Sequence, residues 1–376
     1  MKKIFLILTV IFFSSFVLFV SLLAERYFKL SAIELRKETL NKETFRRQNL
    51  DRKLIKKALN DGYFPIVYPY TFKEHPFLKL VDDLPPLGAN PHTNHYLCNE
   101  GYGLIKLKSD RFGLRNDDEI WDNINLLKNK VLLVGDSFAH GACVEKKDSI
   151  AGNINGNVFN IAMGANDPHI YNASVNVFSN HVKPENLIIV IYDNDFQFNK
   201  KKDIFDNIVS KQGYICGNGP CEKIIQTSIA AHELLISLKK VQGKRQSFMT
   251  RLIKYFNFEY LRKKINFVKR RYFVNDLNLI LKKLALNSKE KCRVANCNLF
   301  FVYIPNSETY RPNILAKSNR ESLFVFLKEH NIKYIDMNRY FKNLDINDLY
   351  AVQGMHLSPK GYKLVAEKIN EYISNK

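Results

Sequence analysis

The stretch Val131-Leu132-Leu133-Val134-Gly135-Asp136-Ser137-Phe138-Ala139-His140-Gly141 decides the fold of this chain. Its four consecutive apolar residues predict a buried strand of a parallel sheet. Gly135 permits a sharp turn after the strand, Asp136 braces that turn, and Ser137 is left at the strand's carboxyl end. Open α/β sheets bind their ligands at this end. Ser137 is therefore a candidate functional residue, provided that other strand ends supply its partners.

Four further apolar segments follow at spacings that leave room for crossover helices. They are residues 158–163, 187–192, 299–304 and 333–337. Together with residues 131–134 they predict an α/β fold in three layers, a five-stranded parallel sheet with helices on both faces. The gap from about 196 to 298 is much longer than one crossover needs, so we expect a helical insertion at about 200–295.

The N-terminal segment predicts a membrane anchor. Residues 4–24 carry no charge, and at about 1.5 Å per residue a helix of this length spans roughly the 30 Å hydrocarbon layer. Leu22 stands where a signal-peptidase site needs a small residue, so we predict an uncleaved signal anchor. Residues 1–3, with Lys2 and Lys3, would form a short cytoplasmic tail. The predicted location is a bacterial-type inner membrane, crossed once, with the rest of the chain extracytoplasmic.

The six cysteines agree with an oxidising compartment. Cys216 and Cys221 form one close pair, and Cys292 and Cys297 form another. Each pair could close a small disulfide loop, which leaves Cys98 and Cys143 for a third bridge, although six cysteines allow 15 connectivities. A zinc site built from the two C-x4-C pairs is the rival interpretation. The histidines near residues 75–95 lack a metal-ligand spacing, so we expect surface or hydrogen-bonding roles for them.

The chain is strongly basic, with 57 Lys and Arg against 37 Asp and Glu and a formal charge of +20. We expect residues 25–104 to form a charged helical stalk followed by an irregular region, and residues 105–376 to form the main domain. Within the insertion, residues 239–271 hold twelve Lys or Arg and one acid. This segment could bind an anionic polymer or lipid surface, or it could pack an apolar stripe on the sheet with its charges in water. Nothing in the chain resembles a nucleic-acid-binding motif.

Three further strand ends and loops offer partners for Ser137. Gly164 follows the segment 158–163 and lets a backbone N–H approach a reacting centre, while Asn194 follows the segment 187–192 with a side-chain amide. His356 lies in a loop before a final amphipathic helix. A serine, a backbone donor, an amide and a histidine together provide a nucleophile, an oxyanion hole and a general base. His140, three residues after Ser137, is a weaker alternative base.

At these residues the chain resembles the SGNH, or GDSL-type, hydrolases. Their four sequence blocks are similar to Gly135-Asp136-Ser137, to the turn from Asn160 to Gly164, to Asn194, and to His356-Leu357-Ser358-Pro359-Lys360-Gly361. The resemblance implies a flavodoxin-like sheet. It also implies that Ser137, Gly164 and Asn194 form the oxyanion hole. Gly164-Ala165-Asn166-Asp167 spells the family's third block as well, but it follows the second strand, so we assign that block to Asn194.

One departure from the family concerns the residue that orients His356. Family members usually carry Asp three residues before the histidine, where this chain has Gln353. In a serine protease the change of this acid to an amide lowers turnover by about 10⁴. The carbonyl oxygen of Gln353, a main-chain carbonyl, or a carboxylate from Asp345 or Asp348 could accept the Nδ1 proton instead. We therefore predict a catalytic set of Ser137, His356 and Gln353.

The resemblance implies a serine esterase or O-acyltransferase that forms an acyl-enzyme on Ser137 and needs no metal or cofactor. Membrane-anchored members of this kind act on acetyl esters of cell-envelope polysaccharides, which predicts an acylated glycan as the substrate. A lipid or general ester hydrolase is the alternative within the same class. A glycan-binding or assembly protein that keeps the fold without catalysis is the alternative of another class, and Gln353 is the residue that favours it.

Overall fold

The computed structural model describes residues 12–27, 42–74, 84–197, 203–210, 212–241, 279–307, 314–351 and 355–374. The chain divides into two compact units. One unit comprises Met1–Lys53 and Leu238–Val274, and the other comprises Leu54–Ser237 and Asn275–Lys376. The second unit holds the sheets and the candidate site, and the following paragraphs concern it unless another segment is named.

The main sheet has five parallel strands, as predicted. They are β4 (Lys130–Val134), β5 (Asn157–Asn160), β6 (Asn186–Tyr192), β9 (Asn298–Ile304) and β10 (Lys333–Asp336), in the spatial order β10-β9-β6-β4-β5. Counted along the chain this is the order 2-1-3-4-5 of flavodoxin-like sheets, whose ligands bind where the first strand lies beside the third. In this chain that switch point is the carboxyl end of β4 beside β6.

The second strand ends earlier than the predicted 158–163. Its last residue is Asn160, whose side chain donates to the Ala139 carbonyl oxygen at 3.1 Å and accepts from the Ala162 backbone N–H at 3.1 Å. The side chain of Asn160 thus joins the end of β5 to the helix that follows β4.

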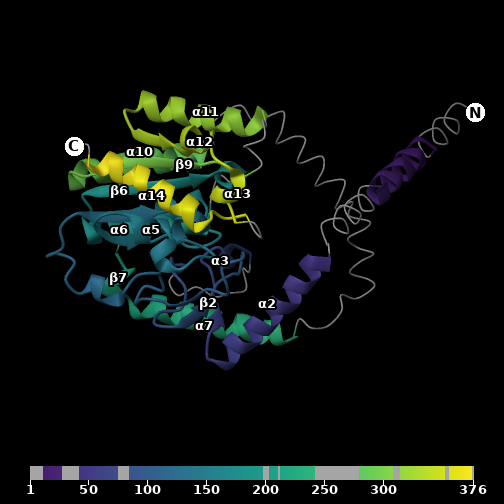
Figure 1. The fold of residues 1–376 in the computed structure, drawn as a ribbon, viewed down its shortest axis with the longest axis horizontal. Coiled ribbons are helices and arrows are strands. Elements are labelled where there is room, and N and C mark those ends of the chain that lie inside the picture. Colours follow the sequence, from purple (N-terminus) through teal and green to yellow (C-terminus); the bar gives the residue numbers. More distant parts are fainter. Residues whose placement is uncertain are drawn as a thin grey trace, which may run out of the picture. The chain divides into compact units, whose positions relative to one another are not determined.

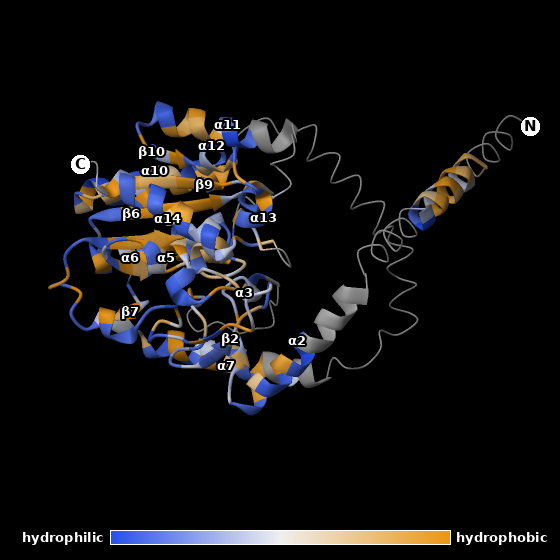
Figure 2. Ribbon diagram, viewed as in Figure 1, coloured by the Kyte–Doolittle hydropathy of each residue, from blue (hydrophilic) through white to orange (hydrophobic). Residues whose placement is uncertain are grey.

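Helices cover both faces of this sheet, which confirms the three-layer prediction (Figures 1 and 2). Alternate strand residues enter different cores: Leu132 and Val134 pack on one face, and Val131 and Leu133 on the other. The first face is covered by α6 (Pro168–Val182), α10 (Leu279–Ala295) and α11 (Ile314–Glu329). The second is covered by α5 (Ile150–Asn153), α12 (Met337–Phe341) and α14 (Pro359–Ser374).

A separate three-stranded sheet precedes the main one in the chain. It consists of β1 (Phe64–Pro65), β2 (Asn94–Tyr96) and β3 (Lys106–Lys108), with β2 and β3 antiparallel. Of the alternating residues 102–108, only the short β3 is a strand, and it pairs outside the main sheet. A third small sheet pairs β7 (Ile215–Cys216) with β8 (Gly219–Pro220).

The remaining elements are mostly short. The α-helices are α2 (Lys42–Asn60), α3 (Thr71–Glu74), α4 (Ser137–His140), α7 (Glu222–Val241) and α13 (Ile346–Leu349), and the 3-10 helices are η1 (Asp118–Trp121), η2 (Lys146–Asp148), η3 (Asp193–Gln197) and η4 (Ile204–Asn207). Within the stretch expected to be an insertion, α10 packs on α6 and places Leu281, Leu284 and Ala285 in the core. It is therefore the crossover helix that leads into β9.

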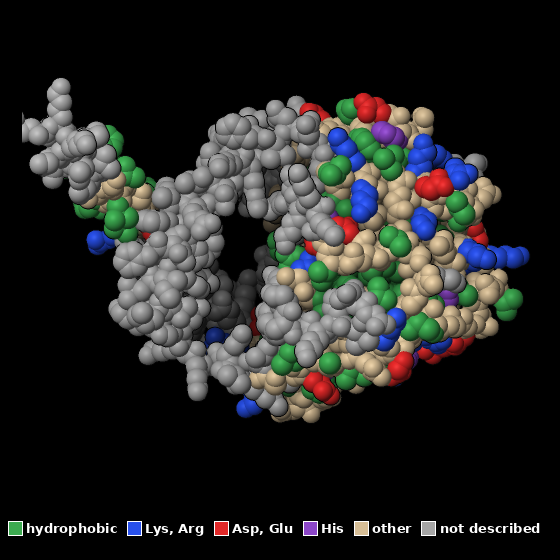
Figure 3. Space-filling model, turned by 180° about the vertical axis from the view of Figure 1, so that it is seen from behind, with side chains coloured by type: hydrophobic (Ala, Val, Ile, Leu, Met, Phe, Trp, Pro, Cys, Tyr) green, Lys and Arg blue, Asp and Glu red, His purple; other side chains and the backbone are tan. Residues whose placement is uncertain are grey.

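Two predicted segments are described only in part. Residues 12–27 are helical, and among the described residues no helix is both long enough and apolar enough to cross a membrane. Of the basic segment 239–271, only residues 239–241 lie within the described part, at the end of α7. On the face of the molecule in Figure 3, described Lys and Arg side chains are interspersed with Asp and Glu.

The buried central strand β6 gives a first prediction about stability. Leu187 is fully buried in the core, so replacing it by Ala removes apolar contacts and leaves a cavity. We expect Leu187→Ala to lower the free energy of unfolding by about 3–5 kcal/mol. In contrast, Leu126 is 79 % exposed, and Leu126→Ala should change the free energy of unfolding by no more than about 0.5 kcal/mol. Urea denaturation of both variants measures the difference, and similar values for the two would contradict the described core.

Candidate active site

The turn that carries Ser137 is formed where β4 ends and α4 begins. Gly135 is required here because a Cβ atom would lie 2.7 Å from the Ala139 Cβ atom and 3.1 Å from the Val190 carbonyl oxygen. The Asp136 carboxylate accepts a hydrogen bond from the Phe138 backbone N–H at 2.9 Å and so caps α4. These two residues fix Ser137 at the carboxyl end of β4.

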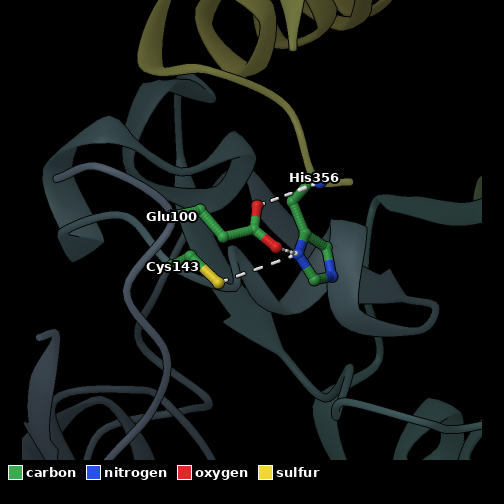
Figure 4. A group of neighbouring side chains, drawn as sticks. All are labelled: Glu100, Cys143 and His356. Carbon is green, nitrogen blue, oxygen red and sulfur yellow. Dashed lines mark hydrogen bonds and ion pairs between the residues drawn. The ribbon is translucent and has the colours of Figure 1, made fainter. Parts of the chain in front are cut away.

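His356 lies next to Ser137 and is held on its other side by Glu100. The His356 Nε2 atom is 2.9 Å from Ser137 Oγ, and its Nδ1 atom is 2.8 Å from Glu100 Oε1. Figure 4 shows the carboxylate of Glu100 facing Nδ1. When Nδ1–H donates to the carboxylate, Nε2 is unprotonated and can accept the proton of Ser137. Serine, histidine and acid thus form one hydrogen-bonded line.

Glu100 is fixed by three N–H groups of the loop that carries His356. Besides the Nδ1–H bond, its oxygens accept from the backbone N–H of His356 at 3.0 Å and of Met355 at 3.2 Å. Burial alone would raise the pKa of Glu100, but the hydrogen bonds and charge of His356 outweigh it and lower that pKa. The Glu100 carboxylate is therefore ionised at every pH at which His356 acts as a base.

Sequence reasoning did not find Glu100. Gln353, its predicted counterpart, lies outside the described residues. Of the two alternatives, Asp348 pairs with Lys360 at 2.7 Å and Asp345 caps α13, so neither takes the position on Nδ1. One signal was present: Cys98 lies two residues before Glu100 and Cys143 lies six residues after Ser137. A bridge between these cysteines would bring Glu100 close to the nucleophile.

The predicted oxyanion-hole residues follow β4 and the two strands on either side of it, β5 and β6. Gly164 follows β5, and a Cβ atom there would lie 2.6 Å from the Tyr68 ring. Asn194 follows β6, and its Nδ2 atom lies 3.5 Å from Asp136 Oδ2, directly beside the Ser137 turn. In the competing block, Asp167 caps α6 by accepting from the His169 and Ile170 backbone N–H groups. The Asn194 amide thus contacts the residue that precedes the nucleophile.

The amide of Asn194 gives a second prediction. If it holds the oxyanion, Asn194→Ala should lower kcat for an aryl acetate by about 10²- to 10³-fold, the usual loss for one such donor, with little change in KM. Asn155 is an exposed asparagine outside the site, and Asn155→Ala should leave both constants within about twofold, as expected for a surface substitution. Equal values of kcat and KM for the two variants would show that Asn194 does not bind the oxyanion.

His140 is not suited to act as the base. It is 1 % exposed, and burial, followed by the charge of Arg115, lowers the pKa of its side chain to about 3. Burial likewise raises the pKa of Asp136 to about 6, and its contact with the Phe138 N–H gives it a supporting role. Outside the site, His95 is fully buried, whereas His92 is exposed; His75 lies outside the described residues.

All six cysteines form disulfides, with the pairing that the sequence suggested. The bridges are Cys98–Cys143, Cys216–Cys221 and Cys292–Cys297, so the zinc interpretation of the C-x4-C pairs is wrong. Atoms of Glu100, Cys143 and His356 also lie within 4.8 Å of one another. The sulfur of Cys143 is oxidised, however, and offers no thiolate to a metal.

Comparison with known proteins adds two findings. No family model and no curated protein matches the chain. Among solved structures, it is similar to a member of the lipolytic G-D-S-L family from Veillonella parvula, with 13 % identity, a TM-score of 0.33, and 66 % of this chain and 99 % of that one covered. It is also similar to a catalytic mutant of an acetylxylan esterase from Geobacillus stearothermophilus, with 12 % identity, a TM-score of 0.36, and coverage of 66 % and 96 %. Likeness at this level assigns no function, which must come from the site itself.

Proposed function

We propose that this chain is a serine esterase whose acyl-enzyme forms on Ser137. The observation that carries the proposal is the hydrogen-bonded line from Glu100 through His356 to Ser137, with links of 2.8 and 2.9 Å. This line lies at the switch point of a flavodoxin-like sheet, where such sheets bind their ligands. A nucleophile, a base within hydrogen-bond reach and a group that orients the base are the parts that acyl transfer needs.

In the first step, Ser137 Oγ attacks the carbonyl carbon of the ester while His356 Nε2 takes the hydroxyl proton. The carbonyl oxygen becomes an oxyanion, and we assign its binding to the backbone N–H groups of Ser137 and Gly164 and the amide of Asn194. The negative charge of Glu100 stabilises the imidazolium. When the tetrahedral intermediate collapses, the C–O bond to the alcohol breaks and His356 returns its proton to the leaving oxygen.

The second step reverses these roles. A water molecule gives a proton to His356 and attacks the acyl-enzyme, which releases the acid and restores Ser137. A sugar hydroxyl in place of water would give O-acyl transfer by the same residues. The chemistry of the site suits both acceptors, so the ratio of acetate release to acetyl transfer on an oligosaccharide is the measurement that separates them.

For the substrate we propose acyl esters, such as acetyl esters, of cell-envelope polysaccharide. Three disulfides favour an oxidising, extracytoplasmic compartment, and the uncharged residues 4–24 favour a single membrane anchor. The basic segment 239–271 would suit an acidic glycan or a lipid surface. A lipid or general ester hydrolase is the second candidate within this class. The alternative of a non-catalytic protein is less favoured, because Glu100 supplies the carboxylate that the amide of Gln353 cannot provide.

Covalent labelling tests the proposed function directly. A fluorophosphonate should modify the full chain at Ser137, and the protein should hydrolyse an aryl acetate. Ser137→Ala should abolish both, because each reaction forms a bond to the Ser137 hydroxyl oxygen. Ser210→Ala, a change in a loop residue after η4, is the control and should retain both. Absence of labelling and hydrolysis in the wild-type protein would refute the esterase and favour the binding-protein alternative.

A further inference from the structure

The Cys98–Cys143 disulfide lies against the candidate active site. The Cys143 sulfur is 3.7 Å from His356 Nδ1, the nitrogen that also faces Glu100 (Figure 4). The bridge joins residues 45 positions apart, whereas each of the other two disulfides joins residues only five apart. Those two close local loops, at the β7–β8 hairpin and at the junction of α10 with β9.

The Cys143 end of this bridge is firmly held. Cys143 is 1 % exposed, and the buried guanidinium of Arg115 donates to the carbonyl oxygens on both sides of it, Gly141 at 2.6 Å and Val144 at 2.8 Å. The Ala142 backbone N–H donates to the Ser137 carbonyl oxygen at 2.9 Å. Cys143 is therefore fixed relative to Ser137 by short-range contacts.

The Cys98 end carries the acid. Glu100 lies in the loop between β2 and β3, beyond the last cross-strand bonds, which join Leu97 and Cys98 to Ile105. Within the loop, the Asn99 side chain accepts from the backbone N–H groups of Gly101 and Gly103. The loop thus belongs to the small three-stranded sheet, while Ser137 belongs to the main one. The disulfide is a covalent link between the two, placed two residues from Glu100.

This placement matters because the acid acts only when it is close to Nδ1. A loop on a small sheet opens at low free energy when few buried contacts hold it, and catalytic groups must be kept within about 0.5 Å of their working position. A cross-link removes conformations in which the loop and the nucleophile segment separate. The cross-link therefore raises the fraction of molecules in which Glu100 contacts His356.

We infer that Cys98 and Cys143 are positioning residues, whose disulfide keeps Glu100 on His356 and thereby maintains the active triad. The effect on catalysis rests on the proposed function. The effect on the contact between Glu100 and His356 does not, so the two are measured separately.

The kinetic test uses the full chain with Cys98→Ala and Cys143→Ala combined. We expect kcat for an aryl acetate to fall about 10-fold or more, with KM within about twofold, because the acid and not the binding surface is displaced. The matched control, Cys216→Ala with Cys221→Ala, removes a disulfide elsewhere and should leave both constants nearly unchanged. In a Glu100→Gln background, removing Cys98 and Cys143 should lower kcat no further, since residues that act through one another are not additive. An equal fall in that background would overturn the inference.

A second variant distinguishes an effect of the disulfide from an effect of misfolding. In a chain that keeps only the Cys98–Cys143 bridge, dithiothreitol should reduce this disulfide to two thiols, itself becoming a cyclic disulfide, and kcat should fall. Reoxidation should restore kcat, which a chain that had lost its fold would not allow. Unchanged kcat after complete reduction, verified by thiol titration, would overturn the inference.

A spectroscopic readout needs no enzymatic activity. In ¹⁵N-histidine-labelled protein, the His356 ring, identified by comparison with His356→Gln, should carry its proton on Nδ1 because of Glu100. Loss of this signature in the Cys98→Ala, Cys143→Ala variant, as in Glu100→Ala, supports the inference even if the wild-type protein hydrolyses nothing. An unchanged signature overturns it, whatever the esterase activity.

Discussion

Glu100→Gln is expected to lower kcat for an aryl acetate by about 10³- to 10⁴-fold, comparable with the acid-to-amide change in a serine protease. The two Glu100 oxygens together accept from three N–H groups, on His356 Nδ1 and on the backbone of His356 and Met355. An amide has one oxygen and one NH₂ group, so in either orientation its NH₂ faces an N–H donor. In one orientation the imidazole loses the acceptor that fixes its tautomer, in the other the NH₂ faces the backbone N–H of His356, and in both the negative charge that stabilises the imidazolium is lost. The substrate surface is unchanged, so KM should stay within about threefold.

Asp348→Asn is the matched control for this variant. Asp348 is the carboxylate that the sequence placed nearest to His356, but it pairs with Lys360 at the surface. Its kcat should remain within about twofold of wild type, as for other surface changes. The reverse result, a large loss in Asp348→Asn and little in Glu100→Gln, would reject the described triad.

The contact between Glu100 and His356 makes the stability of the fold depend on pH. The folded state lowers the pKa of Glu100 below its ordinary value of 4.5, so its contribution to stability is present above that value and is lost as pH falls through the lowered pKa. The difference in Tm between wild type and Glu100→Gln should therefore be largest near neutral pH and vanish in acid. A difference that does not depend on pH would mean that the charge of Glu100 is not what stabilises the loop.

His356→Gln is expected to have the larger effect on activity. Without a base at 2.9 Å from Ser137 Oγ, the hydroxyl is not activated, and loss of the base in a serine protease lowers kcat by about 2 × 10⁶. Labelling by a fluorophosphonate should also disappear, because the same proton must be removed. Assays stopped at successive times, and single-turnover assays, measure the residual rate over long periods.

His92→Asn is the control for the histidine change, since His92 is exposed and its backbone φ of 50° suits asparagine. Labelling and hydrolysis should both persist in this variant. If His356→Gln retained more than about a tenth of wild-type kcat, a loss far below that expected for a general base, a different base would have to act. His140, despite its burial, would then be the candidate for that base.

The main sheet could be predicted from the sequence because its strands are buried on both faces. The runs 131–134 and 187–192 are apolar throughout, which is the pattern of strands with helices on either side. The small sheet could not be predicted, because β1, β2 and β3 are two or three residues long and carry polar residues such as Asn94 and Lys106. Strands this short leave no periodic signal.

The residues of the candidate site likewise include some that could be predicted from the sequence and one, Glu100, that could not. Ser137 and Asn194 lie within three residues of the ends of β4 and β6, and Gly164 lies four residues after the end of the shorter β5, so the strand ends indicated these residues. Glu100 lies in a hairpin loop of the small sheet, and only the spatial approach of Cys98 to Cys143 connects it with Ser137. The sequence suggested this bridge by elimination, but it did not show that the loop with Glu100 would face His356, and the motif expected three residues before His356 indicated Gln353 instead.

The origin of Glu100 in the β2–β3 hairpin has a practical consequence for work with fragments. The order along the chain is acid, serine, histidine, and the acid lies before residue 105, where the sequence pattern suggested that the main domain begins. A recombinant fragment cut at that boundary would keep the entire five-stranded sheet and Ser137 with His356, yet it would lack Glu100 and Cys98 and leave Cys143 as an unpaired thiol. Inactivity of such a fragment would therefore say nothing about the complete chain, whereas a fragment beginning at Leu54 retains the complete triad.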